Sequence, residues 1–215
     1  MKLRSPIVLL SVLVVALAFA GCSRDKKKTG PSKLVKDGTL VFQDDFERGE
    51  FGDRWKVDSP SWKISGGWLH DTSARNEGAW LLEELPEQVR IEFKARSEMP
   101  KQGGFRGDMK CEVFAAKPEH QAGYILIFGG WENSVNAIAR LDEHGDDRQN
   151  DNSRSVVAGQ TYEWAIVRKD GKLRWYLDGE LFMTYDDKVP LEGRHFGFNN
   201  WTSDVYFDDL KVYQL

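Results

Sequence analysis

The sequence of 215 residues predicts an all-β protein, a two-sheet antiparallel β-sandwich. From about residue 40 onward, apolar and polar residues alternate with a period of two, as in strands that bury one face. Gly, Asn, Asp and Pro interrupt this alternation at short intervals, which is typical of strands joined by tight turns. No stretch shows a long helical period. A length of this size fits one domain, and 40% hydrophobic residues argue against disorder.

The expected strands follow from the alternating runs and the turn residues between them. The clearest hairpin turns at Asp170-Gly171, since Asp-Gly between two alternating runs is a strong turn signal, and a second turn lies at Asp178-Gly179. The strands are expected near residues 39–44, 54–58, 62–65, 67–72, 78–84, 87–96, 108–116, 121–129, 134–143, 161–169, 172–178, 181–186, 193–199 and 203–214.

Residues 1–21 have the features of an export signal. A basic start precedes an apolar run from Ile7 to Ala20, which is too short to span a bilayer comfortably. The run ends in small residues before Cys22, and this ending resembles a bacterial lipobox, although Phe19 stands where Leu is commonest. An uncleaved anchor and an ordinary secretory signal are the alternatives. We expect cleavage by signal peptidase II and lipidation of Cys22.

The predicted organisation is a signal peptide at 1–21, a lipidated flexible tether at 22–37 and a β-sandwich domain at 38–215. The tether is polar and basic and contains Gly30-Pro31. Several acyl chains anchor a protein stably in a membrane. Ser23, where Asp would favour the inner membrane by resemblance to known sorting rules, points to the outer membrane of a bacterial cell envelope.

The charge and the number of cysteines argue against a nucleic-acid partner and against a disulfide-stabilised fold. A net charge of −4 without a long basic block argues against a nucleic-acid partner, because phosphate binding depends on clustered Lys and Arg. Two cysteines cannot build a disulfide framework. With Cys22 lipidated, Cys111 remains, and it alternates with Met109 and Val113 on an apolar strand face. We expect a buried, inert thiol there.

Four motifs carry a resemblance to a known family. They are the opening Phe42-Gln43-Asp44-Asp45-Phe46, the hairpin from Trp62 to Trp68, the hairpin from Leu173 to Glu180, and the closing Val205 to Tyr213. Together they resemble the concanavalin A-like lectin/glucanase jelly roll, and in particular bacterial laminin-G-like and 3-keto-disaccharide hydrolase-like domains. The resemblance covers residues 38–215. It implies a ligand site on the concave sheet, but folds of this kind host unrelated functions.

The candidate binding residues come from the side that alternation assigns to each polar residue. Asn136, Arg140 and Asp142 lie two or four apart, so on a strand they share one face. Aromatic rings pack on sugar C–H faces, and planar polar groups pair with hydroxyls. The predicted set is Arg90, Glu92, Tyr124, Trp131, Asn136, Arg140, Asp142 and His144. The alternative is that these charges are cross-strand ion pairs on a solvated sheet.

The eight tryptophans divide into core and candidate ligand contacts. Most alternate with polar residues and are expected to pack inside the sandwich. Trp131, which follows Gly129-Gly130, and Trp201, which follows Asn199-Asn200, are the best candidates for exposure.

A catalytic role is the rival hypothesis. Family 16 glucanases of this fold carry two Glu and one Asp interleaved on one strand, and we identify no such spacing here. If the protein is an enzyme, a glycoside hydrolase or polysaccharide lyase, the catalytic candidates are Glu112, Asp142 and His144, with Glu143 pointing away from them.

A structural Ca²⁺ is the one cofactor that the sequence suggests. The first and last strands of such sandwiches usually pair, which would bring Asp44 near Asp208, and Ca²⁺ prefers carboxylate oxygens. The alternative is turn and edge capping by Asp. The acidic segment 145–153 lacks the spacing of a calcium loop and is expected to be a mobile flap.

The sequence therefore predicts a membrane-anchored lipoprotein whose β-sandwich binds a poly- or oligosaccharide without catalysis. The alternatives are a glycan-degrading enzyme of the same fold, and a structural or protein-interaction lipoprotein.

Overall fold

The computed structural model describes residues 33–101 and 103–215. The predicted signal segment, Cys22 and the tether up to residue 32 lie outside the described residues.

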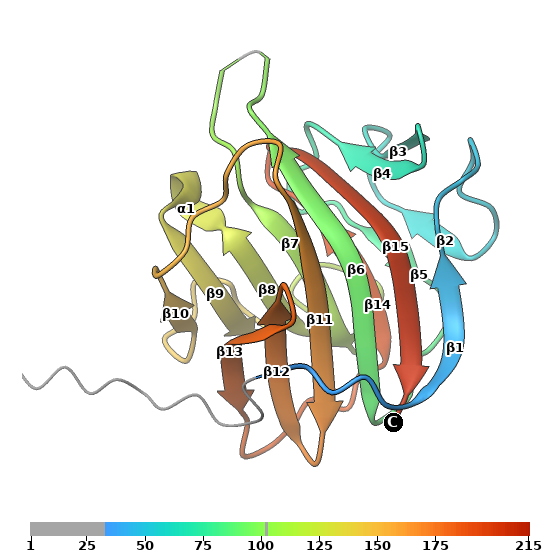
Figure 1. Ribbon diagram of the computed structural model, residues 1–215, viewed down its shortest axis with the longest axis vertical. Coiled ribbons are helices and arrows are strands. Elements are labelled where there is room, and N and C mark those ends of the chain that lie inside the picture. Colours follow the sequence, from blue (N-terminus) through green and yellow to red (C-terminus); the bar gives the residue numbers. More distant parts are fainter. Residues whose placement is uncertain (1–32, 102) are drawn as a thin grey trace, which may run out of the picture.

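Two antiparallel sheets stack face to face (Figure 1). Sheet A has the order β13-β12-β11-β6-β15-β4-β3, with β1 also pairing with β15. Its strands are β1 (Thr39–Asp44), β3 (Lys63–Ser65), β4 (Trp68–Asp71), β6 (Val89–Glu98), β11 (Thr161–Lys169), β12 (Lys172–Leu177), β13 (Glu180–Asp186) and β15 (Asp204–Gln214).

Sheet B has the order β10-β9-β8-β7-β14-β5-β2. Its strands are β2 (Trp55–Val57), β5 (Ala79–Leu81), β7 (Met109–Ala115), β8 (Tyr124–Gly129), β9 (Val135–Arg140), β10 (Gln149–Asp151) and β14 (His195–Asn199). A single helical turn, α1 (Gly130–Asn133), joins β8 to β9. The predicted all-β two-sheet sandwich is confirmed.

The core lies between the two sheets and is rich in aromatic rings. Phe93 of sheet A stacks on Trp164 at 5.1 Å between ring centroids, and Phe198 of sheet B stacks on Phe207 of sheet A at 4.4 Å. Such ring pairs stabilise beyond the area that they bury. Cys111 also lies in this core, and burial raises the pKa of its thiol, as expected of an inert cysteine.

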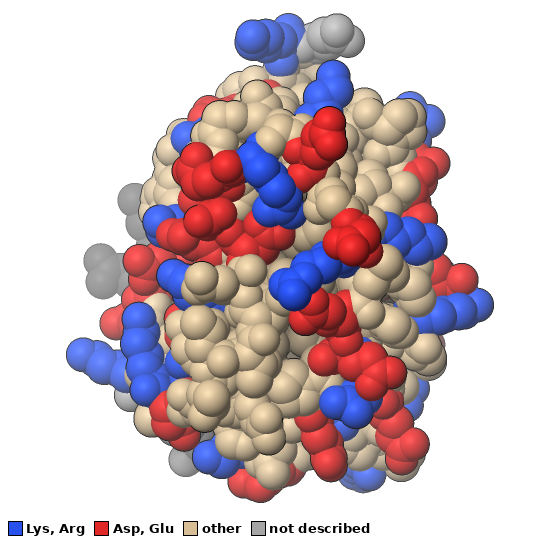
Figure 2. Space-filling model, turned by 90° about the vertical axis from the view of Figure 1, so that its right-hand side faces the viewer, with Lys and Arg blue, Asp and Glu red and all other residues tan. Residues whose placement is uncertain are grey.

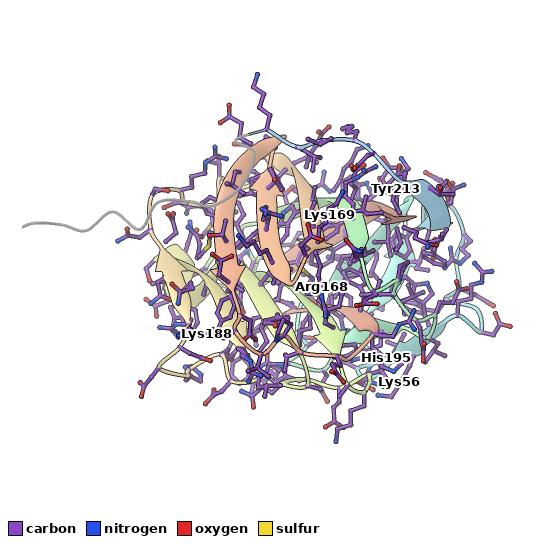
Figure 3. All side chains as sticks on the ribbon, turned by 90° about the horizontal axis from the view of Figure 1, so that it is seen from below. Lys56, Arg168, Lys169, Lys188, His195 and Tyr213 are labelled. Carbon is purple, nitrogen blue, oxygen red and sulfur yellow. The ribbon has the colours of Figure 1, made fainter. Side chains whose placement is uncertain are left out.

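Seen from below, the sheets form two layers, with Lys169 on the sheet A side and Lys56 and His195 on the sheet B side (Figure 3). Arg168 lies between the layers, where its guanidinium is 4.2 Å from the centroid of the Phe114 ring. Acidic and basic side chains are interspersed on the side that carries β1 and β2 (Figure 2), which agrees with the absence of long basic blocks in the sequence.

Each strand expected from the sequence is present, with ends that differ by a few residues. The Asp170-Gly171 hairpin joins β11 to β12, and β1 pairs with β15 as expected. The expectation of a mobile flap at 145–153 was partly wrong, because β10 lies within it and pairs with β9, with Asn150 opposite Ala137. Short polar strands at a sheet edge carry little hydrophobic pattern, so periodicity does not find them.

The end of the predicted tether lies against sheet A. The backbone N–H of Leu34 donates to the carbonyl of Gly179 at 2.9 Å, and Arg90 binds the backbone carbonyl of Asp37. Residues 33–37 therefore cross the lower part of sheet A before β1 begins (Figure 1). Within the part of the chain that the structure describes, no helix is both long and apolar enough to cross a bilayer.

Gly197 of β14 gives a test of the packing on the outer face of sheet B. A Cβ there would lie 2.5 Å from the ring of Trp80, which is fully buried. We expect Gly197→Ala to lower the free energy of unfolding by about 1–3 kcal/mol, as overpacking does. The control is Gly49→Ala, because nothing lies within 4 Å of a Cβ at Gly49. Equal urea midpoints for the two variants would contradict this packing.

Candidate functional site

A cavity of about 730 Å³ opens on the outer face of sheet B, and we call it the sheet B cavity. Its walls come from the β6–β7 loop (103–108), the β14–β15 loop (201–203), the α1 turn, and the loops that follow β7 and β9. The β6–β7 loop and α1 lie at the upper end of the molecule in Figure 1. The volume is typical of small-ligand sites.

Lys110 forms the floor of the sheet B cavity. Its side chain is 3% exposed, and its Nζ lies 2.8 Å from Asn76 Oδ1, 3.0 Å from Glu143 Oε2 and 3.7 Å from Asp108 Oδ1. Asn76 Nδ2 in turn donates to Glu143 Oε1 at 3.2 Å. A buried ammonium is tolerated when it is paired and hydrogen-bonded, and here it ties three separate segments of the chain together.

Glu112, the next outward-facing residue along β7, holds a second buried cluster. It is fully buried, and its carboxylate contacts His120 Nδ1 at 2.6 Å and accepts hydrogen bonds from Gln121 N at 3.0 Å and Asn199 Nδ2 at 2.7 Å. The contact at Nδ1 leaves Nε2 as the remaining polar atom of the His120 ring. His120 lines the cavity, so Glu112 fixes the orientation of a ring that a ligand can meet.

Strand β7 therefore carries ionisable groups on its outer face and apolar groups on its inner face. Lys110 and Glu112 form the outer row, and the inner row packs in the core against sheet A. Both faces are buried along the whole strand. Loops satisfy the polar row, since Glu143, His120 and Asn76 all reach it from outside the strands. One strand thus positions both the core and the floor of the site.

The two carboxyl groups beside Lys110 have pKa values that move in opposite directions. Burial, with a contribution from the Glu143 charge, raises the pKa of Asp108 to about 6 in spite of the attraction of Lys110. Burial also acts on Glu143, but the charge and hydrogen bond of Lys110 and the charge of His120 hold its pKa below the usual range. Such divergence between neighbouring groups in a cavity is characteristic of functional sites.

Aromatic side chains form the rim. Trp131 is 36% exposed and Trp201 is 50% exposed, and among the described residues these two tryptophans are the most exposed. The expectation that they differ from the core tryptophans is confirmed, and both line the sheet B cavity together with Phe105. The guanidinium of Arg148 lies 4.3 Å from the Trp131 ring centroid, and the His144 ring lies 5.8 Å from it.

The backbone that carries Trp131 is left-handed. Trp131, Glu132 and Asn133 have φ values of 48°, 62° and 64°. Residues other than glycine rarely adopt this left-handed conformation, which costs about 1–2 kcal/mol per residue. Asn133 compensates, because its Oδ1 accepts from Val156 N at 2.8 Å and its Nδ2 donates to Val156 O at 3.0 Å. Strained turns of this kind concentrate at ligand sites.

The structure brings three of the sequence-predicted binding residues together and separates the others. Trp131 and His144 line the cavity, and Asp142 supports them, since its Oδ1 accepts from His144 N at 2.9 Å. Asn136 does not face the cavity: its Oδ1 accepts from Gly129 N and its Nδ2 donates to Arg154 O. It shapes the turn before α1 from the core side of β9.

Arg140 and Tyr124 meet away from the cavity, on the carboxylate of Asp187. Arg140 Nε and Tyr124 Oη each donate to Asp187 Oδ2 at 2.8 Å. Burial, with the neighbouring Asp187 carboxylate, raises the pKa of Tyr124 to about 12. Both side chains therefore connect β8 and β9 to the segment that follows β13.

The face predicted for β9 was reversed. Alternation correctly puts Asn136 and Arg140 on one side and Ala137 and Ala139 on the other, but the alanines face outward with Ile125 and Ile127 of β8. The strand then ends at Arg140, because Leu141 has a φ of 64°. Asp142 therefore lies in a turn and shares no strand face with Asn136.

Arg90 and Glu92 lie on sheet A, on the other layer from the cavity. Arg90 Nε pairs with Glu92 Oε1 at 2.8 Å, and the Arg90 guanidinium stacks on the Tyr213 ring at 4.1 Å. This arrangement is closer to the alternative hypothesis of charge pairing on a sheet than to a ligand site.

The predicted binding set leaves out Asp108, Lys110, His120, Glu143 and Asn76, although alternation puts Lys110 on the polar side of its strand together with Glu112. One signal was present: Asp108, Lys110 and Glu112 alternate with Met109, Cys111 and Val113, which puts three ionisable groups on one face of a strand. Glu143 was expected to point away, and it turns toward Lys110 because the chain leaves the strand at Leu141. His120 and Asn76 lie in loops, where periodicity carries no information about facing.

The residues proposed for calcium do not fit a metal site as they stand. Asp44 accepts hydrogen bonds from Arg48, from Phe46 N at 3.0 Å and from Trp55 Nε1 at 2.9 Å, so a cation would compete with an arginine. Asp208 accepts from the N–H of its neighbour. Across residues 33–101 and 103–215, no three His, Cys, Asp or Glu side chains come close enough to hold a metal ion. Calcium binding stays a prediction.

Comparisons with known proteins agree on the fold. The chain is similar to the carbohydrate-binding module CBM66 from Bacillus subtilis, with 15% identity and a TM-score of 0.61 over 75% of this chain and 96% of that one. It is similar to SCLam, a non-specific endo-β-1,3(4)-glucanase from family GH16, with 13% identity and a TM-score of 0.59 over 87% and 95%. A laminarinase from Flavobacterium sp. UMI-01 has 14% identity and a TM-score of 0.57 over 82% and 100%.

At these identities the likeness shows a shared fold, the concanavalin A-like jelly roll, which carbohydrate-binding modules and glycoside hydrolases have in common. A family model described as farnesoic acid O-methyl transferase matches residues 113–209, less than half of the chain. No curated protein matches.

The raised pKa of Asp108 predicts that ionisation of this carboxyl group lowers the free energy of unfolding. Its folded value of about 6 lies above the ordinary 3.8, so between these pH values the folded protein holds more protons at Asp108 than the unfolded chain does. This group's contribution to the free energy of unfolding therefore falls as pH rises from about 4 to about 6, by roughly 3 kcal/mol. Asp108→Asn cannot ionise, so above pH 6 it is expected to be more stable than the wild type.

Urea unfolding of the two proteins at pH 4 to 8 measures the difference directly, and the exposed Asp146→Asn is the matched control. A difference between Asp108→Asn and wild type that is constant over this range would show that Asp108 is not destabilised by its burial.

Proposed function

We propose that the sheet B cavity binds a carbohydrate and that the protein is a carbohydrate-binding protein without catalysis of its own. The observation that carries this proposal is the pair of exposed tryptophans, Trp131 and Trp201, beside a polar floor. Tryptophan rings offer flat apolar surface to sugar C–H groups. The Lys110 and Glu143 floor offers polar groups that are already held in place, so a ligand does not have to order them.

The charges that line the cavity favour a neutral ligand. Asp108, Glu132 and Glu143 are balanced in large part by Lys110 and Arg106. The acidic and basic groups of the floor are also paired with each other, so they produce no strong field of one sign. The structural neighbours, a carbohydrate-binding module, an endo-β-1,3(4)-glucanase and a laminarinase, support a glycan as the ligand class.

Lipid anchoring at Cys22 in the bacterial outer membrane is included in the same proposal. Residues 33–37 cross the lower part of sheet A, whereas α1 and the β6–β7 loop lie at the upper end (Figure 1). The tether would therefore join the domain on sheet A, away from the loops that form the cavity.

Replacing the rim tryptophans tests the binding site. We expect Trp131→Ala and Trp201→Ala each to weaken binding at least about tenfold, or about 1.4 kcal/mol, because each removes a stacking surface. A glycan array identifies ligands, and isothermal titration calorimetry measures the affinities. The matched control is Trp68→Ala, since Trp68 lies on β4 of sheet A, in the layer that does not carry the cavity.

Two results would contradict the proposal. One is an array without any hit, together with a melting temperature that no sugar changes. The other is equal weakening in all three variants, which would show that loss of a tryptophan acts through stability and not through contact with the ligand.

Glycan degradation is the second candidate function, and a specific observation favours it. The buried Glu112 orients His120, and Asp108 has a pKa of about 6, so the cavity holds a positioned imidazole and a carboxyl group suited to proton transfer near neutral pH. Of the pair expected to act together in catalysis, His144 lines the cavity, and Asp142 accepts a hydrogen bond from His144 N.

We expect no release of reducing or unsaturated sugars from polysaccharides by the wild type. Release that is lost in both Asp108→Asn and Glu112→Gln, with folding preserved by circular dichroism, would identify the protein as an enzyme. Release that persists in both variants would point to a contaminating activity.

A further inference from the structure

The outer face of sheet B is covered along its five inner strands, whereas the edge strand β2 carries the exposed Lys56 on the same face. Trp80 of β5, Asn199 of β14, Glu112 of β7, Ile125 of β8 and Ala139 of β9 all point outward from the sheet. Each of them is fully buried. A glycan cannot lie across these five strands, because the surface that it would contact is already covered.

Two loops cover this face, and hydrogen bonds hold both to it. The β7–β8 loop (116–123) is tied down by the contact of His120 with Glu112. The β9–β10 loop (141–148) is tied down by the ion pair between Glu143 and Lys110. The loops are joined to each other, because Leu141 N donates to Gly123 O at 2.9 Å. Both loops contribute to the wall of the cavity, through His120, Gln121, Glu143 and His144.

The opposite walls are also held in place. Arg106 Nε donates to Val156 O at 2.8 Å, and Ser203 Oγ donates to Phe105 O at 3.3 Å, so the β6–β7 and β14–β15 loops are linked. Asn76 N donates to Asn200 O at 2.9 Å and ties the loop after β4 to the same wall. The cavity is therefore bounded by hydrogen-bonded segments on several sides.

A bounded cavity and an open groove select different regions of a polysaccharide. In a groove, a chain enters at one end and leaves at the other, so internal units bind. In a cavity that is walled on several sides, a long chain has no straight path across, so its end fits the space better than an internal stretch does. We infer that the sheet B cavity recognises the end of a glycan chain, or a free short oligosaccharide, and not an internal stretch. This inference rests on the proposed function.

Competition with polymers of different length tests it. The full domain is bound to an immobilised array glycan and displaced with the same glycan in solution, intact or after partial acid hydrolysis, with laminarin and pullulan as defined additional probes. Hydrolysis multiplies chain ends at constant mass, and a reducing-sugar assay counts them. We expect the competition curves of intact and hydrolysed glycan to coincide when plotted per chain end and to separate by the ratio of ends when plotted per mass.

Curves that coincide per mass, or an intact polymer that competes better than its hydrolysate, would overturn end recognition while leaving carbohydrate binding in place. Absence of binding to every glycan would overturn the proposed function and this inference with it. Trp131→Ala should lose the competition and Trp68→Ala should retain it, which ties the result to the sheet B cavity and not to another surface.

Discussion

The buried ammonium of Lys110 is the interaction on which the shape of the candidate site depends. It sits on β7, and it holds Asn76 from the loop after β4, Glu143 from the loop after β9, and Asp108 from the loop that precedes β7. Removing Lys110 would leave Asp108 and Glu143 buried without their common cation, which costs several kcal/mol. Glu143 belongs to the β9–β10 loop, which lies over sheet B. The ion pair between Lys110 and Glu143 therefore also positions one wall of the cavity.

The fold could be predicted because its signals are local. Period-two alternation and Asp-Gly turns identify strands and hairpins from a few neighbouring residues, and β11 and β12 lie where these signals put them. The site could be predicted only to a limited extent, because its contacts join distant residues: Lys110 meets Glu143 across 33 positions, and Glu112 meets Asn199 across 87. Alternation separates two faces of β9 but does not say which of them a loop will cover.

The rim tryptophans were within reach of the sequence for a different reason. A tryptophan that follows Gly-Gly or Asn-Asn stands at the end of a strand, where the core no longer surrounds it, and Trp131 and Trp201 both occupy such positions. What the sequence did not show is that Trp131 lies on three consecutive left-handed residues. That conformation depends on the contacts of Asn133 with the backbone of Val156, which lies 23 positions away.

Two features that lower stability lie at the sheet B cavity, and this bears on the third hypothesis, a purely structural or protein-interaction lipoprotein. The left-handed turn under Trp131 and the buried Asp108 carboxyl both lower stability. A sandwich whose core is built from stacked aromatic rings does not need either of them to fold. Features that lower stability persist where activity requires them. Two such features at the same cavity, beside two exposed tryptophans, favour a ligand site over a surface that serves packing alone.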